Sequence, residues 1–223
     1  MDEFVEQFLN VEVMAKYLPD VVQGLWITLA LALLIIAAGL LLGLVLAVIR
    51  SFQVRVVNWT IVIFVDVFRS LPPLVIIVLL YFALPVVGLN WSGFACAWLA
   101  LSLVLAAFVE EIYWAGITSV HKGQWEAARS TGLGFLATLI YVVLPQVTRM
   151  TIPPLTNRTI VIAKNTALAS VVAVQEMLTV AQTSLAYAAN TSPLTLAALG
   201  YILMFLPLVI LSRWIERRFA WKR

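Results

Sequence analysis

Residues 21–49 contain no charged side chain, and this run most constrains how the chain can fold. At about 1.5 Å of rise per residue, a helix of that length exceeds the roughly 30 Å of hydrocarbon in a bilayer. The whole chain is 63% apolar and 11% charged, and its mean hydropathy is +1.04. A soluble protein needs much more surface charge than this. Lipid must therefore cover the chain, and we predict an integral membrane protein.

Four further apolar runs predict further transmembrane helices. They lie near Ile61–Leu84, Trp91–Val109, Pro145–Leu178 and Leu194–Ser212. Apolar and polar residues do not alternate with period two over repeated segments, so the spans are helices and not barrel strands. The sequence thus predicts an all-α, polytopic membrane protein with about five transmembrane helices. The run Leu133–Pro145 is too short for a comfortable span, and we interpret it as an interfacial helix or the run-up to span four.

The charges are distributed unevenly between the two sides of these spans. Residues 1–20 carry five acidic side chains and one basic one, and basic residues favour the cytoplasm. We therefore expect a periplasmic segment 1–20, a transmembrane domain 21–215 and a basic cytoplasmic tail 216–223. A sixth span at 133–145 would place the C-terminal bases outside. The bases on the expected inner side are Arg50, Arg55, Lys122, Arg129, Arg149, Arg213, Arg217, Arg218, Lys222 and Arg223.

Metal and nucleic-acid sites are not expected. Cys96 lies alone in an apolar run, and His121 has no second histidine or cysteine nearby. The net charge of +3 sets orientation in a membrane protein and does not indicate nucleic acid.

The longest polar stretch, about Ser119–Thr151, falls on the expected cytoplasmic side. Residues 124–130, QWEAARS, favour a helix because alanine, glutamate and arginine are good helix formers. Gly132 and Gly134 permit a tight turn, after which FLATLIY offers a second, apolar helix. Such a hairpin suits docking to another protein. A solvated connecting loop is the alternative.

Four stretches resemble a known family. EAARSTGLGFLATLIYVVLPQ, residues 126–146, is similar to the EAA motif of the membrane subunits of bacterial ATP-binding-cassette (ABC) importers. FRSLPPLVIIVLLYFALP (68–85), EEIYWAGITSVHKGQWEAA (110–128) and LPQVTRMTIPPLTNRTIVIAKNTALASVV (144–172) resemble the polar-amino-acid branch of those permeases. The stretches follow in the family's order, and the resemblance covers roughly residues 20–215.

The resemblance implies the type I ABC importer permease (MetI-like) fold and import of a polar L-amino acid across the bacterial inner membrane. It implies three kinds of partner: a second permease, identical or a sister chain, two ATP-binding subunits and an external substrate-binding protein. The sequence has no G-x-x-x-x-G-K-[ST] phosphate loop, so the partner ATPase would bind ATP and Mg²⁺. This chain would then be a transporter subunit and not an enzyme. Which amino acid is carried stays open.

In the family, the EAA region forms a coupling helix that docks in a groove of the ATPase; here it would cover about 119–146. Glu126 would offer a charged anchor, Ala127 and Ala128 a face for close approach, and Gly132 the bend. With Gly123 these are the expected ATPase-coupling residues. Closure of the ATPase pair on ATP would rock the spans from inward- to outward-facing.

Polar groups inside the spans are candidates for the translocation path, because a mid-span charge costs roughly 2.5 to 3.5 kcal/mol unless it meets a partner or a cavity. Lys164, Asn165 and Thr166 lie midway through the fourth run. A zwitterionic amino acid would supply the carboxylate that Lys164 needs; snorkelling or pairing within the protein is the alternative. We include Arg69 and Glu111 in the same set, although Glu111 at the inner end of span three also suits an interface charge.

Local spacing suggests several structural roles. Asp66 and Arg69 lie three residues apart on one helical face and could neutralise each other. Pro72 and Pro73 should kink the second span. Glu176 lies near the external face, where a substrate-delivering protein or solvent would meet it.

Two positions depart from the family pattern. Trp114 stands where a basic residue is usual, which could alter a charge contact at the inner end of span three. Asn165-Thr166-Ala167 replaces Asp-Thr-Ser, which removes a carboxylate from span four.

Two other functions were weighed. A stand-alone secondary transporter or channel would need inverted repeats or its own ion-coupling carboxylates, and five spans do not divide into two equal halves. A membrane enzyme would need a catalytic cluster at membrane depth, and one histidine with scattered carboxylates argues against it.

Overall fold

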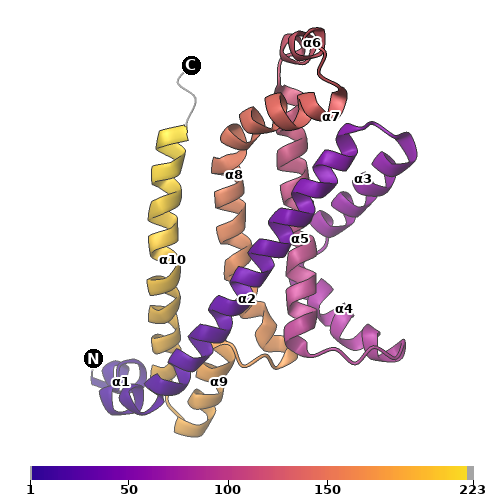
Figure 1. Cartoon of the computed structure of the whole chain (residues 1–223). Coiled ribbons are helices and arrows are strands. Elements are labelled where there is room, and N and C mark those ends of the chain that lie inside the picture. Colours follow the sequence, from indigo (N-terminus) through magenta and orange to yellow (C-terminus); the bar gives the residue numbers. More distant parts are fainter. Residues whose placement is uncertain (1, 220–223) are drawn as a thin grey trace.

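The computed structural model describes residues 2–219, which fold as a bundle of helices (Figure 1). Helix α2, Val11–Ser51, crosses the bundle diagonally and packs on α5, Gly93–Ser119. Helices α8, Leu144–Lys164, and α10, Ser192–Phe219, stand beside them. Four described segments are long and apolar enough to cross a membrane, or five if the bent pair α3–α4 counts as one span. The predicted all-α architecture with about five spans is confirmed.

The second span is broken at its two prolines. Helix α3, Arg55–Ser70, and helix α4, Pro73–Val86, meet at 104°. Leu71 and Pro72 are extended, and neither proline has an N–H to continue the hydrogen-bond ladder of α3. The predicted kink is confirmed, and it is a corner between two helices.

The fourth span has different limits from those predicted. Helix α7, Phe135–Thr138, a π-helical turn η1, Leu139–Val143, and α8 follow one another without a loop, so the run 133–145 is the run-up to this span. Beyond α8 the chain tightens into a 3₁₀ helix, η2, Asn165–Val172. Ala173 then adopts a left-handed conformation with φ of 55°, which ends the helix. This end lies within the expected range of about Pro145–Leu178; hydropathy did not locate it more closely because it does not register a change of backbone conformation.

Glycines set the distance between α2 and α5. A Cβ added to Gly39 would lie 2.7 Å from Leu105 Cβ, and one added to Gly43 would lie 2.5 Å from Val109 Cβ. Real Cβ atoms do not approach each other this closely, so both positions require glycine. The G-x-x-x-G spacing therefore serves packing within this chain.

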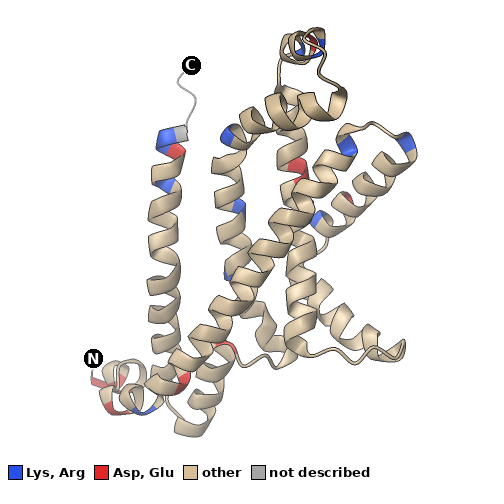
Figure 2. Cartoon of the chain, viewed as in Figure 1, with Lys and Arg blue, Asp and Glu red and all other residues tan. Residues whose placement is uncertain are grey.

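The two ends of the bundle differ in charge. Figure 2 shows acidic side chains gathered at the end that holds the N-terminus, and most lysines and arginines toward the opposite end. Two short helices cover the N-terminal end, α1, Asp2–Phe8, and α9, Met177–Ala188. The Gln7 carbonyl accepts a hydrogen bond from Thr191 N–H, which ties α1 to the connection before α10. Lys222 and Arg223 of the expected basic tail lie outside the described residues.

Replacing Gly43 by alanine should weaken the fold, because neither Val109 Cβ nor the Ala106 carbonyl, 2.7 Å from the added atom, can move independently of α5. We expect a loss of about 1 to 3 kcal/mol in the free energy of unfolding, seen as a lower thermal midpoint of the detergent-solubilised protein. Gly134→Ala is the matched control, since nothing lies within 4 Å of its added Cβ. Equal midpoints for the two variants would contradict the close approach of α2 and α5.

Candidate functional site

The polar hairpin predicted between spans three and four protrudes at the basic end of the bundle (Figures 1 and 2). Helix α6, Lys122–Ser130, begins where the ring nitrogen Nδ1 of His121 accepts a hydrogen bond from Gly123 N–H at 3.1 Å. The turn after α6 places Gly132 at φ of 92°, a conformation that favours glycine. The predicted helix, turn and second helix are confirmed.

Helix α6 presents its two faces differently. Glu126 and Ala127 are exposed, whereas Ala128 is buried against the rest of the protein. A charged side chain and a methyl group are thus available on the outer face. Gly123 is half-buried at the start of the helix.

Three aromatic rings fasten this hairpin to the end of α2. Trp125 of α6 stacks on Phe135 of α7, with ring centroids 5.5 Å apart. Phe135 also contacts Phe52, at the C-terminal end of α2, with centroids 5.3 Å apart. A cavity of about 380 Å³ opens beside the stack, and its lining includes Glu126 and Trp114. The hairpin is therefore attached to both α2 and α5, which precedes it directly in the chain.

A buried ion pair joins α2 to α5 near this end. One guanidinium nitrogen of Arg50 lies 3.0 Å from a carboxylate oxygen of Glu110, whose side chain is fully buried. The guanidinium carbon also lies 4.5 Å from the centre of the Trp114 ring. Trp114, which replaces a basic residue of the family pattern, therefore stacks on a cation that an additional positive charge would repel.

The expected pairing of Asp66 with Arg69 was wrong. Arg69 forms its ion pair with Glu111 of α5, while Asp66 is exposed. A spacing of three residues permits an ion pair within one helix. Arg69, however, is the last residue but one of α3, which ends at Ser70, and its side chain reaches α5 instead. Arg69 and Glu111, both predicted for the translocation path, are thus brought together.

The structure separates the other predicted path residues. Lys164 is exposed beside α10 and lines a cavity of about 440 Å³ together with Tyr201 and Phe205. Asn165 is half-buried. Thr166 is fully buried, and its hydroxyl donates to the Ala163 carbonyl at 2.8 Å, so it cannot contact a solute in this conformation.

Glu176 is also buried, which corrects its expected place on the outer surface. Its carboxylate accepts hydrogen bonds from the backbone N–H groups of Leu178 and Thr179 and from the Tyr201 hydroxyl. The side chain therefore caps α9 and fastens it to α10. The sequence signal for such a cap is an acidic residue directly before a helix.

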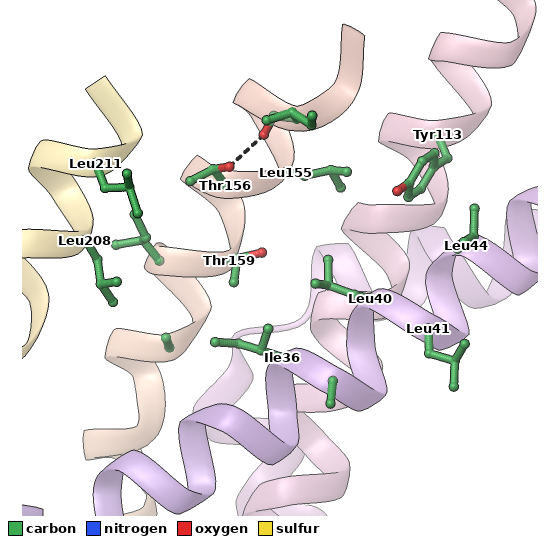
Figure 3. Close-up of a pocket in the computed structure, with 14 residues that line it drawn as sticks. Ile36, Leu40, Leu41, Leu44, Tyr113, Leu155, Thr156, Thr159, Leu208 and Leu211 are labelled. Atoms are coloured by element: carbon green, nitrogen blue, oxygen red, sulfur yellow. Dashed lines mark hydrogen bonds between the residues drawn. The ribbon is translucent and has the colours of Figure 1, made fainter. Parts of the chain in front are cut away.

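A cavity of about 630 Å³ lies between α2, α5, α8 and α10 (Figure 3). Leucine and isoleucine side chains from these helices point into it, and its only polar side chains are those of Tyr113, Thr156 and Thr159. The Thr156 hydroxyl already donates to the Ile152 carbonyl at 2.8 Å. A cavity without a charged side chain cannot replace the water around a zwitterion, so we do not assign the solute path to it.

Comparison with known proteins decides the family. Residues 39–221 match the family described as binding-protein-dependent transport system inner membrane component. The chain belongs to this family.

Individual relatives agree with that assignment. This permease is 32% identical over 216 residues to the probable glutamine ABC transporter permease protein GlnM of Bacillus subtilis (strain 168), covering 94% of this chain and 98% of that protein. It is also 32% identical to a chain of the crystal structure of an amino acid ABC transporter with histidines, with a TM-score of 0.83 over 92% of this chain and 96% of that one. A chain of the MetNI methionine ABC transporter, 20% identical, shares the fold with a TM-score of 0.72 over 94% and 98%.

These matches confirm the predicted type I importer permease fold and make the protein a membrane-embedded transporter component. The interpretation as a stand-alone transporter or channel is not favoured. Sequence reasoning did not identify the anchor of the α6–α7 hairpin, since Phe52, Trp125 and Phe135 come from three separate segments. Aromatic residues on both sides of the polar stretch were the only available signal.

Removing the carboxylate of Glu110 should destabilise the permease strongly, because Arg50 would remain largely buried without its partner. We expect Glu110→Ala to lower the free energy of unfolding by about 3 to 5 kcal/mol, measured by thermal unfolding in detergent. Asp66→Ala, at an exposed acid without an ion pair, is the control and should change it by less than about 0.5 kcal/mol. Replacing both partners, Arg50→Met with Glu110→Leu, should recover most of the loss. If Glu110→Ala and Asp66→Ala lowered the free energy of unfolding equally, the Arg50–Glu110 pair would be excluded as a link between α2 and α5.

Proposed function

We propose that this chain is the permease subunit that conducts a polar L-amino acid inward across a bacterial inner membrane, driven by ATP hydrolysis in a separate subunit. The observation that carries the proposal is the helical hairpin with an exposed Glu126, anchored to the bundle by an aromatic stack. The family match and the amino-acid transporters among its relatives supply the class of solute.

The proposed orientation has the N-terminus outside and the C-terminus in the cytoplasm. Its basis is the positive charge at the end of the bundle that carries α6 (Figure 2). An ATPase that uses cytoplasmic ATP can reach α6 only in this orientation.

Coupling would run through the exposed face of α6. Glu126 offers a charge to a groove of the ATPase, and Ala127 allows the two backbones to approach closely. Ala128 faces inward and, with Trp125, holds the helix on the permease. Gly132 keeps the turn that orients α6, and Gly123 lies in the first turn of that helix, where its N–H bonds to His121. ATP and Mg²⁺ belong to the partner in this scheme.

The proposed assembly contains two permeases, identical or sister chains, two ATPase subunits and an external substrate-binding protein. Five spans in one chain are too few to enclose a solute path comfortably, which supports pairing of two permeases. The capped α9 and the acidic N-terminal segment would face the binding protein on the outside.

The proposed path residues are Lys164, Asn165, Arg69 and Glu111. Arg69 and Glu111 already form a pair between α3 and α5, which a zwitterion could exchange for contacts with its own two charges. Lys164 is exposed and outside any ion pair among the described residues, so its ammonium is free to accept a carboxylate.

Reversing the charge at the proposed dock should uncouple the transporter. We expect Glu126→Lys to lower amino-acid uptake about tenfold or more, measured in proteoliposomes that contain the permease, the ATPase and the binding protein. Membrane insertion should be unchanged, because the side chain is exposed. Glu216→Lys, which reverses an equally exposed acid on α10, is the control. Normal coupled uptake by Glu126→Lys would contradict the assignment of α6.

Removing the ammonium of Lys164 tests the path separately. We expect Lys164→Ala to reduce uptake about tenfold while the complex still assembles, because a charged hydrogen bond to the solute would be lost. Lys164→Arg keeps the charge and should retain more uptake than Lys164→Ala. Wild-type uptake by Lys164→Ala would remove this residue from the path.

A further inference from the structure

Arg158 is a charged residue of α8, within the fourth span. Its guanidinium carbon lies 3.8 Å from the centre of the Phe108 ring of α5. The guanidinium carbon of Arg69 lies 5.4 Å from the same centre. The two guanidinium carbons are therefore within about 9 Å of each other, beside one aromatic ring.

This cluster lies at membrane depth. Phe108 is eleven residues before Ser119, the inner end of α5, which corresponds to about 17 Å along a helix. Arg158 is fourteen residues beyond Leu144, the start of α8, which corresponds to about 21 Å. Neither arginine can extend to the cytoplasmic surface over such a distance.

The two arginines differ in their partners. Arg69 is neutralised by Glu111. Among the described residues, no carboxylate lies within 4 Å of Arg158, and its side chain donates no hydrogen bond. Its partner is the Phe108 ring. The residue is only partly buried. Stacking occupies the face of a guanidinium and leaves its N–H groups free to donate.

A charge held at this depth needs a partner or a cavity, and the ring supplies only part of the compensation. The cluster has two guanidinium groups and one carboxylate, so it can accept one further negative charge. A guanidinium with a free edge matches the geometry of a carboxylate, which can accept two parallel hydrogen bonds. Glu111, whose side chain is 45% exposed, lies close enough to the same cluster to take an ammonium group.

We propose that Arg158, held flat by Phe108, binds the carboxylate of the transported amino acid at the middle of the membrane. The inference rests on the proposed function and adds a specific recognition group to it. A solute without a free carboxylate would leave Arg158 uncompensated and should be bound poorly.

The test measures binding to the assembled permease–ATPase complex in detergent, by calorimetry. The probes are L-glutamine, L-glutamate, L-arginine and L-cystine, followed by the α-methyl ester of whichever binds best. The wild-type complex should bind the free acid about tenfold or more tightly than the ester. Arg158→Gln should lose this discrimination by binding the acid as weakly as the ester, and Arg158→Lys, which keeps the charge but not the planar fork, should retain part of it. Arg149→Gln, on the same helix but at an exposed position, should discriminate as the wild type does.

The outcomes separate the two proposals. An Arg158→Gln complex that assembles and still prefers the acid by the wild-type factor would overturn the role of Arg158 and leave the proposed function standing. Failure of the wild-type complex to bind any of the four amino acids, or to transport one with its binding protein, would overturn the proposed function and this inference with it.

Discussion

The close contact between α2 and α5 is the constraint on which the rest of the permease depends. Hydrophobicity alone does not bring helices together in lipid, because the acyl chains are as apolar as leucine. Gly39 and Gly43 instead let α2 approach the α5 backbone closely enough for continuous van der Waals contact. Toward the basic end of the same contact, the Arg50–Glu110 ion pair fixes how the two helices align, which apolar packing alone does not do. Because α5 also contacts α3, α4 and α8, its position fixes theirs.

The position of the α6–α7 hairpin depends on this contact between α2 and α5. Only Val120 and His121 separate α5 from α6, so the hairpin follows the inner end of α5. Phe135 adds a second attachment, to Phe52 at the end of α2. A force on α6 would thus act on both α2 and α5, which the glycines and the ion pair hold together. Moving α2 and α5 together as a rigid body requires less distortion than bending either helix.

Properties that depend on local sequence were predictable. The charge-free run 21–49, the corner at Pro72 and Pro73, and the turn at Gly132 each follow from residues adjacent in the chain. Residues brought together by packing were not. Asp66 and Arg69 satisfied the spacing for a pair, yet the end of α3 directs Arg69 to Glu111, 42 positions later in the numbering. Glu176 looked like a surface acid because the sequence does not reveal that Tyr201 and the first N–H groups of α9 enclose it.

The charged groups inside the spans and the apolar cavity of about 630 Å³ differ in what they can hold. Arg50 and Glu110 form a closed ion pair, with a guanidinium nitrogen 3.0 Å from a carboxylate oxygen. At mid-depth, Arg158 has an aromatic ring but no carboxylate among the described residues, which leaves its charge incompletely compensated. A membrane protein tolerates such a charge where water or a solute can reach it. Surrounding the guanidinium with lipid acyl chains instead would cost a large amount of free energy. The 630 Å³ cavity has the opposite character: its leucines and isoleucines favour acyl chains or an apolar neighbour over a zwitterion. In the proposed scheme, solvation of Arg158 would place the aqueous path on the side of α8 that faces Phe108, and a passing carboxylate would be a better partner for the arginine than water alone.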